Sequence, residues 1–337
     1  MAQQNPILVE VTRGAAVESR HRGAAAVCDA GGHVVAAWGD VDAAVFPRSA
    51  VKMFQALPLV ESGAADRFAV SAAELALACA SHNGERAHVD AAAGWLARMN
   101  LSERDLECGA HAPMYEPAAT ELLLKAETPS QLHNNCSGKH AGMLCCAAHL
   151  NAPTKAYIDR DHPVQRAVRA VLEDMSGCDL AGAPVGIDGC SLPTIAMPLV
   201  CLARAMARFA DPASLGAARS RSVTRVRGAM LAHPFMVGGS GRFCTVAMQT
   251  LGGRVAMKTG AEGVYTAALP ERGLGIALKI DDGAKRASEV AIGALLRHLG
   301  VIESPAARAL QSFLNPTLVN RKERTIGEIR PAAGWLN

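Results

Sequence analysis

A serine and a lysine that could act together lie three residues apart in the segment PRSAVK at residues 47–52. If a helix begins in this segment, Ser49 and Lys52 project from the same face of its first turn. A hydroxyl is a weak nucleophile until a neighbouring base takes its proton, and a desolvated lysine amine can be that base. The spacing also fits a simpler interpretation, in which Ser49 only caps the helix and Lys52 is solvated.

Two later segments supply partners for this pair. Ser81-His82-Asn83 lies in a loop between predicted helices, and Lys258-Thr259-Gly260 ends a predicted strand. Together with Ser49-x-x-Lys52, these segments follow the motif order of penicillin-binding proteins and serine β-lactamases. We predict that Ser49 attacks a carbonyl, that Lys52 takes its proton, and that Ser81 passes a proton to the leaving group. Burial and the charge of Lys258 are expected to lower the pKa of Lys52.

The elements that must position these residues predict an α+β fold. Short valine-rich strands come first, helices fill the middle of the chain, and strands separated by glycines return before a last helix. Strands from both chain ends must therefore share one antiparallel sheet. We divide the single catalytic unit 1–337 into a sheet lobe (1–48 and 238–300), a mostly helical lobe (49–237) and a C-terminal tail (301–337). The strands are expected at 7–11, 24–28, 34–38, 243–250, 254–258, 263–269 and 274–280, and the last helix at 284–299.

Composition excludes several classes of protein. The chain has 337 residues, a formal net charge of +3 and 4% aromatic residues, which gives no basis for nucleic-acid binding. No apolar run reaches the roughly 18 residues of a membrane span, and the amino terminus lacks the basic and apolar regions of a signal peptide. We therefore expect a cytoplasmic protein with a small-molecule substrate. Its ten cysteines are expected to be reduced, and most of them, including Cys201, to be small core residues.

Five segments resemble the Rhizobium-type L-asparaginases, also called the asparaginase II or class 3 family. The resemblance runs from about residue 7 to about residue 300, and the Asn-Cys-Ser-Gly-Lys-His block is its most specific part. It implies a fold like that of serine β-lactamases and penicillin-binding proteins, a homodimer, and hydrolysis of L-asparagine to L-aspartate and ammonia. The segments are RSAVK at 48–52, ASHNGE at 80–85, NNCSGKH at 134–140, GIDGCS at 186–191 and KTGAEG at 258–263.

The resemblance also implies roles for individual residues. The nucleophile and its bases form two Ser–Lys pairs, Ser49 with Lys52 and Ser81 with Lys258. A zinc ion close to the substrate is held by Cys136, Lys139 and Cys190. The matching motif positions that line the pocket are Arg48, Asn83, His140 and Asp188.

The implied zinc site has an unusual spacing. Two cysteines on separate loops are reasonable thiolate ligands, but Cys-x-x-Lys is not an ordinary zinc motif. A lysine ligand must first lose its proton, which at neutral pH costs about 3 pKa units, or roughly 4–5 kcal/mol. From the residues alone, Cys136 and Cys190 can also be inert buried thiols, and His140 or His133 can be the third ligand instead. We expect zinc to position the substrate, so that its removal raises KM more than it lowers kcat.

Three other interpretations stay open at this point. One is a cytoplasmic esterase or peptidase of the penicillin-binding type, although His82 replaces the usual acidic middle residue of Ser-x-Asn. In another, Cys136 is the nucleophile and His140 its base. The last is a non-enzymatic protein that responds to zinc or to oxidation through its cysteines, against which the near-neutral charge and the lack of a recognisable DNA-binding module both count.

Overall fold

The computed structural model describes residues 4–336, so Met1, Ala2 and Gln3 of the predicted amino-terminal segment lie outside the described residues. The chain divides into two compact units, each assembled from separate stretches of sequence. Within the described residues, unit 1 comprises 4–50, 197–211 and 246–336, and unit 2 comprises 51–196 and 212–245. Within residues 4–336, no helix combines the length and the apolar character needed to cross a membrane.

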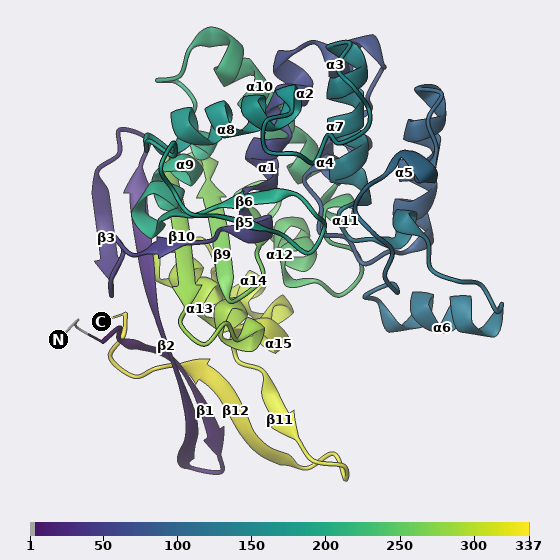
Figure 1. The fold of residues 1–337 in the computed structure, drawn as a ribbon. Coiled ribbons are helices and arrows are strands. Elements are labelled where there is room, and N and C mark those ends of the chain that lie inside the picture. Colours follow the sequence, from purple (N-terminus) through teal and green to yellow (C-terminus); the bar gives the residue numbers. More distant parts are fainter. Residues whose placement is uncertain (1–3, 337) are drawn as a thin grey trace. The chain divides into compact units, whose positions relative to one another are not determined.

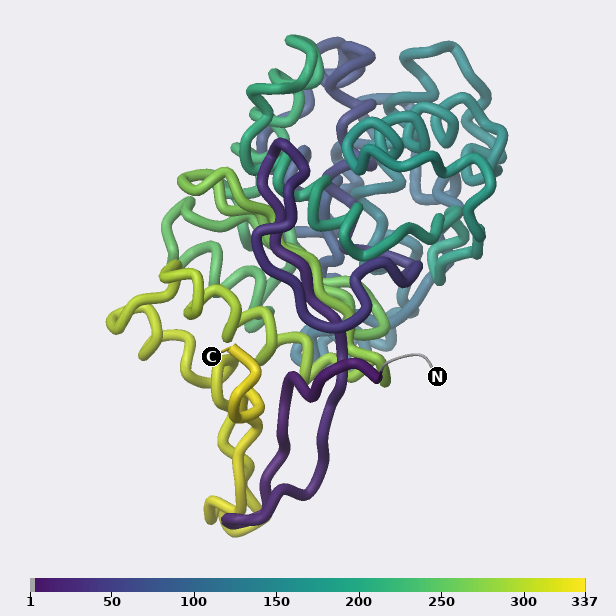
Figure 2. The backbone as a smooth tube through the Cα atoms, turned by 90° about the vertical axis from the view of Figure 1, so that its left-hand side faces the viewer, coloured from purple at the N-terminus to yellow at the C-terminus, as the bar shows by residue number. Residues whose placement is uncertain are grey.

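One antiparallel sheet forms the centre of unit 1. Its strands are β1 (Ile7–Arg13), β2 (Ala16–Asp29), β3 (Val34–Trp38), β8 (Ala256–Thr259), β9 (Val264–Leu269), β10 (Leu274–Ile280), β11 (Thr317–Val319) and β12 (Thr325–Pro331). The strand order is β11-β12-β1-β2-β10-β9-β8, with β3 paired to β2. Val9 lies opposite Pro331, and Figure 2 shows the purple hairpin of β1 and β2 beside the yellow strands β11 and β12. The prediction that both chain ends contribute to one antiparallel sheet is confirmed.

Helices cover this sheet at close range. α9 (Leu199–Ala210) packs against β2, β9 and β10, and α13 (Lys285–His298) packs against β1, β9, β10 and β12. A Cβ atom on Gly275 of β10 would lie 2.0 Å from the Ala207 nitrogen and 2.4 Å from the Ala203 carbonyl oxygen, so only glycine permits this approach of α9. The other elements of unit 1 are β4 (Ala44–Val45), β7 (Met197–Pro198), η4 (Pro270–Arg272), α14 (Ser304–Ala309) and α15 (Gln311–Leu314).

Unit 2 is mostly helical. Its helices are α1 (Lys52–Gln55), α2 (Leu57–Glu61), α3 (Ala64–Arg67), α4 (Ala72–Ala78), α5 (Arg86–Arg98), η2 (Glu103–Asp105), α6 (Glu116–Leu124), η3 (Gln131–His133), α7 (Ser137–His149), α8 (Pro163–Ser176), α10 (Ala217–Ala232) and α11 (Pro234–Val237). Figure 1 shows α7 among the helices of this unit, and it packs against α2, α3, α4 and α5. Every α7 residue from Ser137 to Ala147 is buried. A short hairpin of β5 (Val185–Ile187) and β6 (Pro193–Ile195) completes the unit.

The structure corrects three expectations from the sequence. Residues 243–250 were predicted as a strand, but they form α12 (Phe243–Leu251). The buried side chains of α12 recur at helical spacing (243, 244, 247, 248 and 251), which a short apolar run does not distinguish from a strand. The tail after residue 300, which had no predicted elements, contributes β11 and β12 to the sheet. Cys201 is buried as expected, but it is disulfide-bonded rather than reduced.

Candidate active site

Ser49 lies on η1 (Arg48–Val51), a single 3₁₀ turn that leads directly into α1. Its side chain is half-buried. The preceding residue, Arg48, has a φ of 52°, a left-handed conformation that is uncommon for residues with side chains. Such local strain is found most often at functional sites, because the surrounding structure must stabilise it.

The Lys-Thr-Gly segment lies against the residues around Ser49 within unit 1. The Thr266 hydroxyl donates to the carbonyl oxygens of Ala50 (3.1 Å) and Lys258 (3.3 Å). A Cβ atom on Gly260 would lie 2.7 Å from the Pro47 carbonyl oxygen, so the glycine of this motif is required for the contact. Lys258 itself is fully buried at the end of β8, and its Nζ donates to the Thr259 carbonyl oxygen at 2.8 Å.

In unit 2, the structure brings Lys52 and Ser81 together. Lys52 is the first residue of α1 and is fully buried. Its Nζ lies 3.0 Å from Ser81 Oγ, 2.5 Å from the Ala80 carbonyl oxygen and 2.9 Å from Cys136 Sγ. The resemblance pairs Ser81 with Lys258, and this contact joins Ser81 to Lys52.

Main-chain hydrogen bonds fix the loop that carries Ser81. The Ser81 N–H donates to the Val237 carbonyl oxygen, and the His82 N–H donates to the Asn135 carbonyl oxygen, both at 3.1 Å. The His82 ring, in turn, lies 2.9 Å from the Ser137 hydroxyl through Nε2. The loop between α4 and α5 is thereby attached to the start of α7, next to Cys136.

Burial changes the protonation of Lys52. Removal from water lowers the pKa of its ammonium, because the charged form loses its hydration. The nearby Cys136 opposes this shift, and the positive charge of Lys139 reinforces it. The lowered pKa brings Lys52 closer to the neutral amine that a general base must be.

A second amine–thiol pair lies in the same unit. Lys139, in the first turn of α7, places its Nζ 3.0 Å from the Sγ of Cys190, which follows β5 in the turn of the short hairpin. A hydrogen bond from Cys136 and the charge of Lys139 lower the pKa of Cys190 to about 4, against the effect of burial. Cys136 releases its proton less readily than Cys190 does. The same hydrogen bond and burial raise the pKa of Cys136 to about 11.

Lys139 behaves differently from Lys52. Burial alone would lower its pKa, but the two cysteine side chains beside it, Cys136 and Cys190, raise the pKa above its usual range. The pair with Cys190 is therefore an ammonium and a thiolate, the strong form of such a hydrogen bond.

The residues of this cluster suit a zinc ion in their donor chemistry. The two cysteine side chains are hydrogen-bonded to each other, and the Lys139 amine lies against one of them, so two sulfur donors and one nitrogen donor converge. Among the described residues, no group of three or more His, Cys, Asp or Glu side chains is placed to hold a metal.

The predicted pocket residues are distributed over both units. Arg48 lies in η1 of unit 1, whereas Asn83, His140 and Asp188 lie in unit 2. His140 is fully buried on α7, and burial, reinforced by the charge of Lys139, lowers its pKa to about 3. Asp188 precedes Cys190 in the hairpin turn, where its side chain accepts a hydrogen bond from the Gly189 N–H at 2.7 Å.

A family model described as L-asparaginase II matches residues 9–331. The chain belongs to the L-asparaginase II family. This is an amidohydrolase family. No curated protein sequence matches this L-asparaginase II family member significantly.

Two solved structures are similar to this member of the L-asparaginase II family. Mglu in its native form, in the presence of 4.3 M NaCl, has 17% sequence identity over 85% of this chain, with a TM-score of 0.43. The chain covers only 63% of Mglu's length. A β-lactamase from Mycobacterium bovis has 14% identity over 82% of this chain and 94% of its own length, with a TM-score of 0.39.

Two polar residues that sequence reasoning missed hold a loop in place beside Asn83. The Glu85 carboxylate accepts hydrogen bonds from the Ser240 N–H (2.8 Å) and the Ser240 hydroxyl (2.7 Å), while Asn83 Nδ2 donates to the Ser240 carbonyl oxygen (2.9 Å). Gly239 has a φ of 104°, and a Cβ there would lie 2.5 Å from Glu85 Oε1. In the sequence, only the glycine-rich run at 238–241 indicated a special loop here. That run does not predict that the loop binds Glu85.

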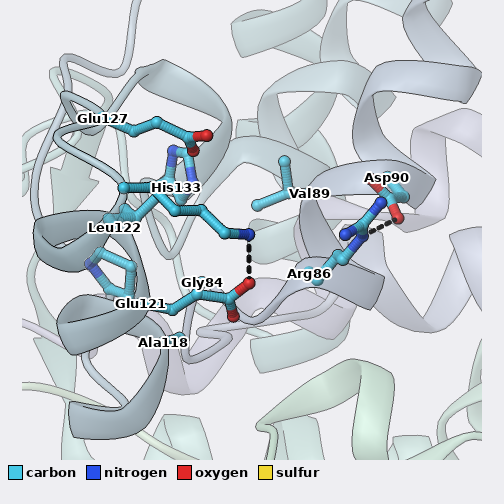
Figure 3. A pocket seen from close by; sticks show the side chains of 11 residues that line it. Gly84, Arg86, Val89, Asp90, Ala118, Glu121, Leu122, Glu127 and His133 are labelled. Carbon is cyan, nitrogen blue, oxygen red and sulfur yellow. Dashed lines mark hydrogen bonds and ion pairs between the residues drawn. The ribbon is translucent and has the colours of Figure 1, made fainter.

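A cavity of about 290 Å³ lies elsewhere in unit 2, between α5, α6 and the loop that carries Gly84. Figure 3 shows Arg86 of this lining paired with Asp90, and Glu121 pairs with Lys125. The lining includes Gly84 and His133 but none of the residues in the two amine–thiol pairs. The cavity is therefore separate from the two amine–thiol pairs.

Proposed function

We propose that this protein hydrolyses L-asparagine to L-aspartate and ammonia, with Ser49 as the nucleophile. The observation that carries the proposal is the buried Lys52 amine, 3.0 Å from Ser81 Oγ, whose pKa is lowered by burial. A desolvated lysine beside a serine is the arrangement expected of a base and a proton relay. The match to the L-asparaginase II family gives the substrate class.

The proposed reaction has two halves. Ser49 Oγ attacks the side-chain amide carbon of asparagine and transfers its proton to Lys52, and the amide nitrogen leaves as ammonia after receiving a proton through Ser81. Water then attacks the aspartyl ester on Ser49 and releases L-aspartate. Over one turnover, Lys52 releases as many protons as it takes up. We assign Lys258 as the second lysine of the relay, paired with Ser81.

We further propose that zinc binds to Cys136, Lys139 and Cys190. When bound, the ion supplies a positive charge that holds an oxygen of the substrate. Cys190 meets the requirement for a thiolate ligand, because its pKa is lowered to about 4. Lys139 must lose its proton to bind zinc, and its raised pKa makes that step more costly. Around this ion, Arg48, Asn83, His140 and Asp188 line the substrate pocket.

The proposal includes a homodimer in the cytoplasm. The homodimer rests on the family resemblance and is tested by the mass measured with light scattering. Eight free cysteines support a reducing compartment, whereas the disulfide-bonded Cys201 points the other way. Fractionation of the native cells, with the protein followed by antibody, decides between the two.

The experiment that tests the activity measures ammonia release from L-asparagine, beside a p-nitrophenyl ester and a β-lactam. We expect turnover of asparagine that the Ser49→Ala variant loses and the Cys136→Ser variant keeps in part. Turnover of the ester alone would support the esterase alternative. Full activity of Ser49→Ala with none in Cys136→Ser would make Cys136 the nucleophile, and no turnover of any substrate would support a non-enzymatic protein.

The structure already weighs against Cys136 as the nucleophile. Its pKa is raised to about 11, so it is a thiol at neutral pH, and its nearest base is Lys52 at 2.9 Å. The Nδ1 atom of His140, the proposed base of that alternative, is engaged by Tyr157. A reactive cysteine requires a lowered pKa, which Cys136 lacks.

A further inference from the structure

A buried tyrosine–histidine contact lies beside the amine–thiol cluster and has no role in the reaction as proposed above. Tyr157, in the loop between α7 and α8, is fully buried, and its hydroxyl lies 2.8 Å from His140 Nδ1. The two rings meet edge to face, and their centroids are 5.6 Å apart. Tyr157 is one of only three tyrosines in the chain, so its burial here reflects a specific position rather than general aromatic packing.

The hydrogen-bond count decides which nitrogen of His140 carries the proton. The Tyr157 oxygen accepts a hydrogen bond from the Glu107 N–H at 2.8 Å. Within residues 4–336, its only other partner is His140 Nδ1, so the phenol proton must point to that nitrogen or remain unsatisfied in the interior. His140 Nδ1 is therefore the acceptor. The ring proton then lies on Nε2.

His140 Nε2 has no hydrogen-bond partner among the described residues, although the side chain is fully buried. A buried N–H donor without a partner costs about 1–3 kcal/mol, so a ligand that accepts from it recovers that free energy on binding. The donor lies next in sequence to Lys139, at the start of α7. An oxygen with negative charge is the acceptor that forms the strongest hydrogen bond there.

Several contacts hold Tyr157 in the orientation that this requires. Gln165 of α8 donates from Nε2 to the Tyr157 carbonyl oxygen at 2.9 Å. Glu107 binds the same loop twice, because its N–H reaches the Tyr157 hydroxyl and its carboxylate accepts from the Ala156 N–H at 2.9 Å. The phenol is thus fixed from its backbone and from its oxygen.

We propose that Tyr157 is a positioning residue that holds His140 as the Nε2–H tautomer, so that His140 donates a hydrogen bond to the α-carboxylate of the bound amino-acid substrate. The inference deepens the proposed asparaginase function and rests on it for the identity of the ligand. The tautomer itself does not depend on that function. A neutral donor fixed in advance binds the carboxylate without reorganisation when the substrate arrives.

Nitrogen NMR of protein labelled with ¹⁵N-histidine tests the tautomer directly. The 11 histidines give one set of ring signals each, and the His140→Gln variant identifies those of His140 by their loss. We expect the wild-type protein to show an unprotonated Nδ1 and a protonated Nε2 at His140, and Tyr157→Phe to show a mixture of tautomers. A protonated Nδ1 in the wild-type protein would overturn the inference, whether or not the protein hydrolyses asparagine.

Steady-state kinetics test the effect on the substrate. Tyr157→Phe should raise KM for L-asparagine about fivefold and change kcat less than about twofold, as expected for one weakened hydrogen bond in the bound state. A glutamine at position 140 carries an amide N–H₂ close to the place of Nε2, and that donor does not need Tyr157. In the His140→Gln background, Tyr157→Phe should therefore leave KM unchanged.

The outcomes separate the inference from the proposed function. An equal rise of KM in both backgrounds, or a Tyr157→Phe variant that is less stable but keeps its KM and its tautomer, would show a merely structural role and overturn the inference. Absence of asparagine turnover in the wild-type protein would sink the proposed function, and the NMR experiment would still report on Tyr157.

Discussion

The two amine–thiol pairs of unit 2 have nearly the same N···S distance, but their pKa values are shifted in opposite directions. Lys52 Nζ lies 2.9 Å from Cys136 Sγ, and Lys139 Nζ lies 3.0 Å from Cys190 Sγ. The pKa of Lys52 is lowered and that of Cys136 is raised, which favours a neutral pair. The pKa of Lys139 is raised and that of Cys190 is lowered, which favours an ionic pair.

The difference follows from which thiol can release its proton. Cys136 donates a hydrogen bond to Cys190 and so stabilises the Cys190 thiolate, which in turn keeps Lys139 charged. Lys52 then faces a thiol and a neighbouring cation, and burial decides its pKa. One site thereby holds a lysine suited to act as a base and a thiolate suited to bind a metal.

Substitution of Lys52 should have the largest effect, because it removes the base. We expect both Lys52→Met and Lys52→Arg to lower kcat by about 10²–10⁴-fold, since an arginine stays charged and cannot accept a proton. Ammonia release at saturating asparagine measures this, with Lys125→Met as the control at an exposed lysine. A Lys52→Arg variant with kcat close to wild type would show that the neutral pair is not the base.

Substitution of Lys139 tests the ionic pair. Lys139→Arg keeps a cation beside Cys190 and Lys139→Met does not, but neither side chain can replace an amine as a zinc ligand. We expect both variants to lose zinc on dialysis and to raise KM about tenfold or more, with a smaller change in kcat. Elemental analysis and kinetics measure the two effects.

A chelator applied to the wild-type protein should act in the same direction as the Lys139 substitutions. A large loss of kcat with an unchanged KM would contradict the role of zinc in holding the substrate. Retention of zinc by Lys139→Met would exclude Lys139 as a ligand.

The stability of the protein should depend on pH through His82, which lies near the neutral pair. Burial, which penalises the charged form of the ring, holds the pKa of His82 well below 6.5. The unfolded chain takes up this proton near pH 6.5, so the stability from His82 is fully present above that pH and is lost as the pH falls toward the folded pKa. At pH 5 we expect a loss of about 2 kcal/mol.

Urea unfolding between pH 8 and pH 5 measures this dependence. The free energy of unfolding should fall less steeply with decreasing pH in His82→Gln than in the wild-type protein. His33→Gln should show the wild-type dependence, because the His33 side chain is 85% exposed. An unchanged slope in His82→Gln would mean that the ring is solvated or already charged in the folded protein.

The smallest effect is expected at the exposed pair of Lys125 and Glu121 in Figure 3. These side chains are 47% and 53% exposed, so the pair contributes only about 0.3–0.5 kcal/mol. A double-mutant cycle in urea should give that coupling and no change in kcat. A coupling above about 1 kcal/mol would show that burial is not what distinguishes the buried pairs from this one.

The sequence alone predicts the local features of this molecule well. The segment SAAE at 71–74 has the Ser-x-x-Glu pattern of a capping box, and the structure forms that box. The strands expected at 24–28 and 34–38 form and pair with each other. These features depend on neighbouring residues, which periodicity and turn chemistry describe. The helical turn that carries Ser49 and leads into Lys52 is another local feature, because it also depends only on neighbouring residues.

Features that join distant residues were not predictable in the same way. Lys52 and Cys136 are 84 residues apart, and no local pattern indicates their contact. The charge of Lys139 lowers the pKa of Lys52, and no pattern in the sequence indicated this effect. Tyr157 and Glu85 carry no motif, and their roles follow only from the hydrogen bonds that the fold creates.

The strand order of unit 1 has a consequence for synthesis of the protein on the ribosome. β2 pairs with β10, and β1 pairs with β12, whose last residue is Pro331. The first strands to emerge therefore keep an unpaired edge until nearly the whole chain has been translated, and such edges are prone to pair with other chains. Unit 2 is complete once residue 245 has emerged, so it can fold while the first hairpin is still unpaired. Translation of the last strands is thus the event that closes the sheet, and a nascent chain stalled before residue 317 should depend most on chaperones.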